Sequence, residues 1–304
     1  MITYVSGNIF DSPARVLVNP VNTVGVMGKG LAKEFKKIYP EMFKEYQLYC
    51  EQGSIDIGKL WLYKTDHKWI LNFPTKKSWR SPSKIEYIEA GLSKLTLTYA
   101  EKGITSISFP LLGCGNGELD WETEVHPLIK KYLNKLPIDI YVHLYNAKKD
   151  TAEHQNIEET KQWLRSEPQS LAFSEVWEDL IALFNDQDVF TTPDTDEKFY
   201  PYISDSVMYI SYRNERYEIS KEELLGLWQH IRSMGYCMKS SMPYGLERYS
   251  SYIFGIFGKL SYINLVHISS DYSKIDKIPS LGLHYKAPVN YMEEMTPIES
   301  FEVN

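Results

Sequence analysis

The segment from Asn19 to Gly30 combines residue types that favour binding of a phosphorylated sugar. Two asparagines, Asn19 and Asn22, end an apolar run, and Gly25, Gly28 and Gly30 lead into a helical pattern. Glycines let backbone N–H groups approach a ligand closely, a helix N-terminus favours an anion, and carboxamides hydrogen-bond sugar hydroxyls. The alternative is an ordinary strand-to-helix turn, because the spacing matches neither a dinucleotide-binding glycine motif nor a P-loop.

A second glycine-rich segment runs from Gly113 to Gly117, directly after the apolar stretch 106–111. Glycines at alternate positions permit a backbone that cradles an anion. Two such segments, each following a strand, favour a ligand with more than one phosphate. Cys114 lies in this segment but has no neighbouring base in the sequence, which weakens an interpretation as a nucleophile.

A third polar segment, 72–80, carries Lys76, Lys77 and Arg80. Cations at these positions either face solvent or hold a diphosphate and stabilise developing negative charge. The segment alone leaves both interpretations open.

Alternating strand and helix patterns must position these three segments. Strands are expected at 2–6, 16–20, 59–62, 69–73, 106–111 and 138–144. The clearest helix is expected at 83–102, where Ser83 and Glu86 form the pattern of a capping box and Gly103 follows the last turn. This alternation predicts an α/β fold with a mixed sheet and helices on both faces, and in such sheets ligands bind beyond the carboxyl ends of the strands.

The run VNPVNTVGVMGKGLAKEFK resembles the macrodomains, which bind ADP-ribose. The segments NFPTK and PLLGCGNGELDW are most similar to the DarG branch, the antitoxins of DarT–DarG pairs, which remove ADP-ribose from thymidine in DNA. The resemblance covers residues 1–150 and implies a three-layer α/β/α macrodomain there. Hydrolases of protein-linked or small-molecule ADP-ribose, and readers without hydrolase activity, remain the alternatives.

The resemblance also implies roles for individual residues. Asn22 would orient the distal ribose, and Lys76 would be the catalytic lysine, with Lys77 as the second candidate. Asn8 stands where the family commonly has an aspartate beside the adenine, and Ile9 follows it. The remaining ADP-ribose contacts would be Asn19, Val26, Met27, Gly28, Lys29, Gly30, Thr75, Lys77, Gly113, Cys114, Gly115, Asn116 and Gly117.

Two routes for the lysine stay open. A charged Lys76 would stabilise or protonate the departing base, and a neutral Lys76 would attack the anomeric carbon or capture the ring-opened aldehyde. No cofactor is expected, and no His, Cys or carboxylate spacing demands a metal.

The second half of the chain differs in charge. Residues 151–304 contain 13 Lys and Arg against 24 Asp and Glu, whereas residues 1–150 contain 20 against 16. We expect a connecting helix or linker at 151–167 and a smaller acidic α+β domain at 168–304, with a helix that begins at a Ser174 cap, a hairpin at 207–219, and helices at 221–234 and 247–260. An acidic, aromatic surface repels DNA but fits the basic groove of a DNA-binding protein. The alternative is a solvated helix face with aromatic residues in the core.

The resemblance implies that this domain binds a DarT-type toxin by mimicking its DNA substrate, through carboxylates that include Glu175, Glu178, Asp179, Asp186, Asp188, Asp194 and Asp196. Three scattered cysteines without a CxxC pair argue against a disulfide scaffold. Neither a signal peptide nor an apolar run of membrane-spanning length is evident, so a cytoplasmic location is expected.

Overall fold

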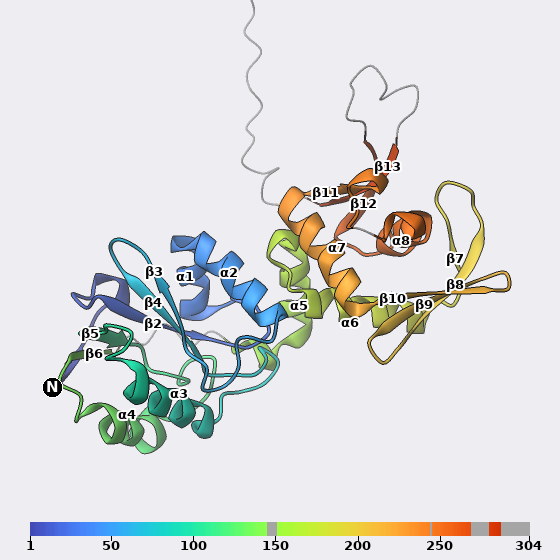
Figure 1. The fold of residues 1–304 in the computed structure, drawn as a ribbon. Helices are drawn as coiled ribbons and strands as arrows, with labels where there is room; N and C mark the ends of the chain where they lie inside the picture. Colours follow the sequence, from blue (N-terminus) through green and yellow to red (C-terminus); the bar gives the residue numbers. More distant parts are fainter. Residues whose placement is uncertain (145–150, 244, 269–279, 287–304) are drawn as a thin grey trace, which may run out of the picture. The chain divides into compact units, whose positions relative to one another are not determined.

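The computed structural model describes residues 1–144, 151–243, 245–268 and 280–286. The chain divides into two units, Met1–Lys161 and Gln162–Asn304 (Figure 1). Among the described residues, no helix has the length and apolar character needed to cross a bilayer.

The N-terminal unit is built on a six-stranded mixed sheet with the strand order β1-β6-β5-β2-β4-β3. All neighbouring strands are parallel except β3, which pairs antiparallel with β4 at the edge. The strands are β1 (Ile2–Val5), β2 (Val16–Val21), β3 (Trp61–Lys64), β4 (Trp69–Pro74), β5 (Ser106–Phe109) and β6 (Asp139–His143). The expected mixed sheet is confirmed.

Helices cover both faces of this sheet (Figure 1). Along β2, Val16 and Val18 pack into one core with α3 and α4, whereas Leu17 and Val21 pack into a second core with α1 and α2. This alternation is the two-residue period of a strand that is buried on both faces. The helices are α1 (Gly30–Ile38), α2 (Pro40–Glu51), α3 (Ile85–Thr98) and α4 (His126–Leu133). The unit is therefore the expected three-layer α/β/α structure.

Short helical turns complete the N-terminal unit. They are the 3-10 turns η1 (Ile9–Asp11) and η3 (Glu153–Gln155) and the π-helical turn η2 (Trp121–Val125), which leads directly into α4. Helix α5 (Ile157–Ser166) follows η3.

The expected capping box at Ser83 is wrong. Helix α3 begins at Ile85, and its N-cap residue is Lys84, which makes no side-chain capping bond. Ser83 is instead buried, and its backbone N–H donates to the Gly117 carbonyl at 3.0 Å. Ser83 therefore forms a tertiary contact with the glycine segment instead of the helix cap that the local pattern predicted.

The C-terminal unit has two antiparallel sheets. One has the order β10-β9-β8-β7 and the other the order β11-β13-β12. The strands are β7 (Phe190–Thr191), β8 (Lys198–Ser204), β9 (Val207–Tyr212), β10 (Glu215–Ser220), β11 (Tyr236–Met238), β12 (Ile263–Ile268) and β13 (Ser280–Tyr285). The hairpin expected around 207–219 is β9–β10, whereas the sequence did not indicate the other five strands.

The helices of this unit are α6 (Phe173–Asp186), α7 (Lys221–Met234) and α8 (Ser250–Phe257), with 3-10 turns η4 (Pro168–Ser170), η5 (Lys239–Ser241) and η6 (Glu247–Tyr249). Helix α7 matches its expected bounds because Ser220 and Glu223 form a capping box and Gly235 adopts a φ of 83° at its end. Helix α6 begins one residue before the expected cap, after Ala172 rather than at Ser174. Trp228 lies in the core and its indole N–H donates to the Leu171 carbonyl at 2.9 Å.

Candidate active site

Three loops meet beyond the carboxyl ends of β2, β4 and β5. We call them the first loop (residues 22–30), the lysine loop (residues 75–80) and the glycine loop (residues 113–117). Since β2 is bonded to β4 on one side and β5 on the other, the parallel register places the three loops at one edge of the sheet. This is the position where ligands bind in open α/β sheets.

Backbone hydrogen bonds join the first loop to the lysine loop. The Thr75 N–H donates to the Val21 carbonyl at 2.8 Å, and the Thr23 N–H donates to the Lys77 carbonyl at 3.3 Å. Asn22 lies between Val21 and Thr23, and Lys76 lies between Thr75 and Lys77, so the two bonds flank both residues. The asparagine and the lysine are therefore held next to each other, although 54 positions separate their segments.

The glycine loop contacts both of the others. A Cβ atom added at Gly30 would lie 3.2 Å from the Asn116 amide nitrogen. The ammonium of Lys76 donates to the Asn116 carbonyl at 2.6 Å. A Cβ at Gly117 would lie only 2.3 Å from the Gly113 carbonyl oxygen, so this position requires glycine. The three segments that the sequence singled out thus form one cluster.

Asn22 organises the first loop. Its amide donates to the Val26 carbonyl at 2.6 Å, and its side-chain oxygen accepts from the Val24 and Val26 N–H groups at 3.0 and 3.3 Å. The Tyr46 hydroxyl of α2 donates to the Asn22 backbone carbonyl at 2.6 Å. Tyr46 is fully buried, and burial raises its pKa well above the ordinary value, so this hydroxyl stays a donor.

The two candidate lysines occupy different environments. Lys76 is 7% exposed, whereas Lys77 is exposed to solvent and contributes its backbone carbonyl to Thr23. Lys76 therefore faces the cluster. Burial lowers the pKa of Lys76, and the negative charges of Glu153 and Glu118 oppose that effect.

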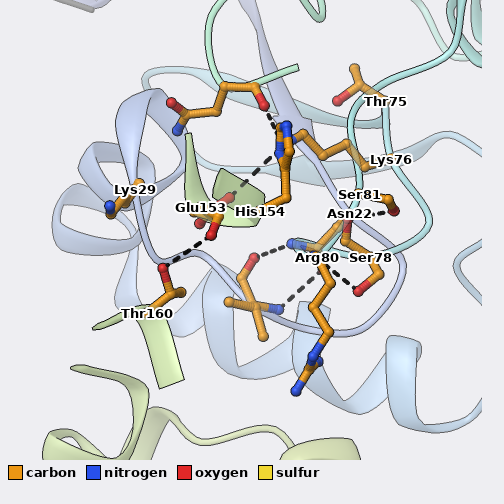
Figure 2. Close-up of polar contacts among 12 residues, drawn as sticks. Asn22, Lys29, Thr75, Lys76, Ser78, Arg80, Ser81, Glu153, His154 and Thr160 are labelled. Carbon is orange, nitrogen blue, oxygen red and sulfur yellow. Dashed lines mark hydrogen bonds and ion pairs between the residues drawn. The ribbon is translucent and has the colours of Figure 1, made fainter. Parts of the chain in front are cut away.

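A carboxylate from a distant segment completes the surroundings of Lys76 (Figure 2). Glu153, in η3, is 7% exposed, and its carboxylate lies 3.9 Å from the Lys76 ammonium. His154 lies 2.9 Å from the carboxylate of Glu118, which follows the glycine loop. Neither Glu153 nor His154 lies in a recognisable motif, so no sequence signal indicated that this segment lies beside the lysine.

The other expected ADP-ribose contacts differ in accessibility. Asn19 is fully buried, and its amide donates to the Asn72 side chain at 2.9 Å, so it joins β2 to β4 inside the sheet. Asn8 is exposed and caps η1 by accepting from the Phe10 N–H at 3.1 Å. Gly30 and Gly115 are exposed, Lys29, Cys114 and Asn116 are half-buried, and the buried positions are Ile9, Val26, Met27, Gly28, Thr75, Gly113 and Gly117.

Cys114 is not poised as a nucleophile. Burial, with the nearby charges of Asp120 and Glu124, raises its pKa to about 12. A thiol with such a pKa is almost entirely protonated at neutral pH, and the thiolate is the reactive form. Among the described residues, no three His, Cys, Asp or Glu side chains form a group that could hold a metal ion.

Residues 18–127 match the Macro domain family model. The N-terminal unit of this chain belongs to the macrodomain family. Its macrodomain is 46% identical over 147 residues to a DNA ADP-ribosyl glycohydrolase of Mycobacterium tuberculosis, and 43% identical over 148 residues to one of Thermus aquaticus. Each match covers 47% of this chain but only 42% and 41% of the relatives, so the macrodomain spans about two fifths of their length.

A solved structure also resembles this macrodomain. The macrodomain of Mycobacterium tuberculosis DarG is 45% identical, with a TM-score of 0.46, and the match covers 48% of this chain and 99% of that one. A DNA ADP-ribosyl transferase-DNA ADP-ribosyl glycohydrolase fusion protein of Thermosipho africanus is 37% identical in an alignment of 162 residues, and the match covers 47% of this chain and 42% of that protein.

The carboxylates expected to bind a toxin fall into two groups. Glu178, Asp186, Asp188, Asp194 and Asp196 are exposed. Glu175 is fully buried, and Asp179 is bonded to Arg165 within the C-terminal unit. The second group is therefore engaged inside the fold, and only the first group presents its side chains to solvent.

Proposed function

We propose that the macrodomain removes ADP-ribose from thymidine bases of DNA by hydrolysing the N-glycosidic bond. The observation that carries this proposal is the buried Lys76 ammonium, which lies between the glycine loop and Glu153 and adjoins Asn22. A purely ADP-ribose-binding domain has no need of a buried lysine with a perturbed pKa in its cluster of loops. The identity of 43–46% to DNA ADP-ribosyl glycohydrolases supports the same choice.

The reaction places charge where Lys76 can act on it. Cleavage breaks the bond between the anomeric carbon and a thymine ring nitrogen, leaving cationic character on the sugar and an anion on the base. Water supplies a hydroxyl to the sugar and a proton to the base, so the products are ADP-ribose and unmodified thymidine. As an ammonium, Lys76 would donate its proton to the departing nitrogen and regain one from water. As a neutral amine, it would instead attack the anomeric carbon and displace the thymine nitrogen, which takes up a proton. Water would then hydrolyse the resulting sugar–lysine bond, releasing ADP-ribose and restoring the amine.

Asn22 contributes by position. Its side chain and the Tyr46 hydroxyl fix the first loop, which would hold the diphosphate and distal ribose against the lysine. Fixing a substrate in the geometry for reaction is itself worth several kcal/mol of the barrier.

The test compares the full chain with Lys76→Ala on a single-stranded oligonucleotide that carries thymidine-linked ADP-ribose. We expect the variant to bind free ADP-ribose and to lose release by about 100-fold or more, the usual contribution of a general acid or base. ADP-ribosylated protein and O-acetyl-ADP-ribose, supplied separately, identify the alternative substrates. Equal release by the variant would refute the role of Lys76, and no release from DNA by the wild-type chain would refute the proposed substrate.

For the C-terminal unit we propose binding of a DarT-type DNA ADP-ribosyltransferase. The observation that favours it is a set of exposed carboxylates, which would fit the basic groove in which such a toxin binds DNA. These carboxylates are Glu178, Asp186, Asp188, Asp194 and Asp196. The transferase–glycohydrolase fusion in Thermosipho africanus shows that the two activities occur in one chain there. Full-length protein in which Asp186, Asp188, Asp194 and Asp196 become asparagine should bind the toxin more weakly, with a smaller salt dependence. Unchanged affinity at low salt would contradict the proposal.

A further inference from the structure

The segment Thr151–Gln155 contacts the start of α1 and the residue that follows the glycine loop, as well as Lys76 itself. The Lys29 ammonium, at the start of α1, donates to the Thr151 carbonyl at 3.4 Å. His154 and Gln155 both contact the carboxylate of Glu118 beside the glycine loop. This segment lies after residue 127, where the family match ends. It is therefore a part of this chain that joins the site from outside the matched region.

Glu153 is the member of the segment that reaches the lysine (Figure 2). Its carboxylate is buried, lies 3.9 Å from the Lys76 ammonium, and accepts from the backbone N–H of Lys29. The Thr160 hydroxyl donates to the Glu153 backbone carbonyl at 3.4 Å, which ties the turn to α5. A buried carboxylate that is fixed at both its backbone and its side chain constrains the group with which it pairs.

We propose that Glu153 is a positioning residue for Lys76, which it holds charged and directed at the glycine loop. His154 and Gln155 support it by holding Glu118, so that the Asn116 carbonyl stays within reach of the lysine. This inference rests on the proposed glycohydrolase function, because it assigns a partner to the lysine of that reaction.

The charged groups around the pair determine the expected pH dependence. Lys76 faces Glu153 from η3 and Glu118, which follows the glycine loop. Glu153 faces Lys76, Lys29 and His154. Burial raises the pKa of Glu153, and these three basic groups oppose that rise. Loss of the Glu153 charge removes an attraction that favours the ammonium, so the pKa of Lys76 must fall further in a Glu153→Gln variant.

This direction holds for either role of the lysine. If the ammonium acts, the alkaline limb of the pH–rate profile moves to lower pH. If the neutral amine acts, the acidic limb moves to lower pH. A glutamate with a merely structural role would change the overall rate or the stability and leave both limbs in place.

The experiment measures release from the ADP-ribosylated oligonucleotide across pH 6 to 10 with the full chain, Glu153→Gln, Glu153→Asp and Glu158→Gln. Glu158 is the matched control, because it lies nearby in the first turn of α5, is exposed, and pairs with Lys161 at 3.3 Å. We expect the limb of the pH–rate profile that reports Lys76 to move to lower pH by about one unit in Glu153→Gln, the usual effect of losing an opposite charge at 4–6 Å. The aspartate variant should restore part of the shift, and Glu158→Gln should match the wild type.

A second readout does not depend on turnover. The pH midpoint of Lys76 acetylation by acetic anhydride, followed by peptide mass spectrometry, should fall in Glu153→Gln and not in Glu158→Gln. An unchanged midpoint in a folded Glu153→Gln variant would overturn the inference. Faster release with tighter ADP-ribose binding would also overturn it, because Glu153 would then obstruct the site. A shifted midpoint in a chain whose wild type releases nothing would refute the proposed function and leave the pairing of Glu153 with Lys76 intact.

Discussion

Lys76 and Arg165 are both largely buried cations beside carboxylates, one in each unit of the chain. The Lys76 ammonium is 3.9 Å from the Glu153 carboxylate and donates its short hydrogen bond to the Asn116 carbonyl. The Arg165 guanidinium makes hydrogen bonds to both oxygens of Asp179, and its separation from the Glu175 carboxylate is 3.8 Å. Tyr262 donates a further bond to Asp179 at 3.0 Å.

The difference between the two clusters appears in their proton affinities. Burial tends to lower both pKa values. For Lys76 burial dominates and the pKa is lowered, whereas the hydrogen bonds and charge of Asp179 outweigh burial and raise the pKa of Arg165. A loosely paired lysine can exchange a proton, and a doubly bonded arginine cannot. We therefore interpret the Lys76 cluster as reactive and the Arg165 cluster as structural.

The largest expected effect comes from replacing Lys76 of the reactive cluster by arginine, the cation of the structural cluster. Lys76→Arg keeps a positive charge but removes the titratable amine, so single-turnover release of ADP-ribose should fall by about 100-fold or more. Calorimetry with free ADP-ribose should show binding preserved. Release within a few-fold of the wild type would mean that positive charge alone is required and would contradict a proton-transferring or nucleophilic role for Lys76.

Removal of the structural cation should affect stability instead. Arg165→Met leaves Glu175 fully buried without its nearby guanidinium and should lower the free energy of unfolding by about 3 kcal/mol. Urea unfolding monitored by tryptophan fluorescence measures this loss, and release of ADP-ribose by the folded fraction should be unchanged. Arg213→Met is the matched control, because Arg213 pairs with Glu197 at 2.9 Å but is 74% exposed; it should cost less than about 1 kcal/mol.

The reactive cluster should also depend on the shape of the glycine loop. A methyl group at Gly117 would meet the Gly113 carbonyl oxygen at 2.3 Å, and the carbonyl cannot yield without moving the loop that binds Lys76. Gly117→Ala should weaken ADP-ribose binding about tenfold, a loss of about 1.4 kcal/mol. Gly226→Ala, in α7, places a methyl group that meets nothing within 4 Å and should leave ADP-ribose binding unchanged, so equal weakening in both variants would contradict this account.

The smallest expected effect is a pH dependence of stability from Glu153 in the Lys76 cluster. The pKa of Glu153 is raised mainly by burial, so the folded chain keeps a proton that the unfolded chain loses between the ordinary and the raised pKa. Stability from this group is therefore full below the ordinary pKa and falls as pH rises through that window. The melting temperature of Glu153→Gln relative to the wild type should accordingly rise with pH above about 4.5, the ordinary carboxyl range. A constant difference from pH 4 to 8 would show that Glu153 does not titrate differently on folding.

Local patterns predicted much of the architecture. The apolar runs around Val16 and Ile107 indicated strands, and the glycine-bearing segments after them indicated loops at one sheet edge; both are confirmed. Caps were predicted less well, because Ser83 bonds to the glycine loop while the true capping box, Ser220 with Glu223, lies in the other unit. Other strands of the C-terminal unit were not predicted, because β7 and β11 are only two and three residues long and β8 contains Pro201, which weakens a strand pattern.

Local sequence patterns indicated the three loops and the strands that precede them, because glycine spacing and apolar runs are local properties. The resemblance to macrodomains, and not the local pattern, favoured Lys76 over Lys77. Three features follow from tertiary packing alone: Lys76 rather than Lys77 faces the cluster, Asn19 is buried inside the sheet, and Glu153 lies beside Lys76. Burial and charge pairing depend on segments far apart in the chain, and for Glu153 and Lys76 the 76 intervening positions carry no trace of the contact. That is why the loops were predictable from the sequence and the proton affinity of the lysine was not.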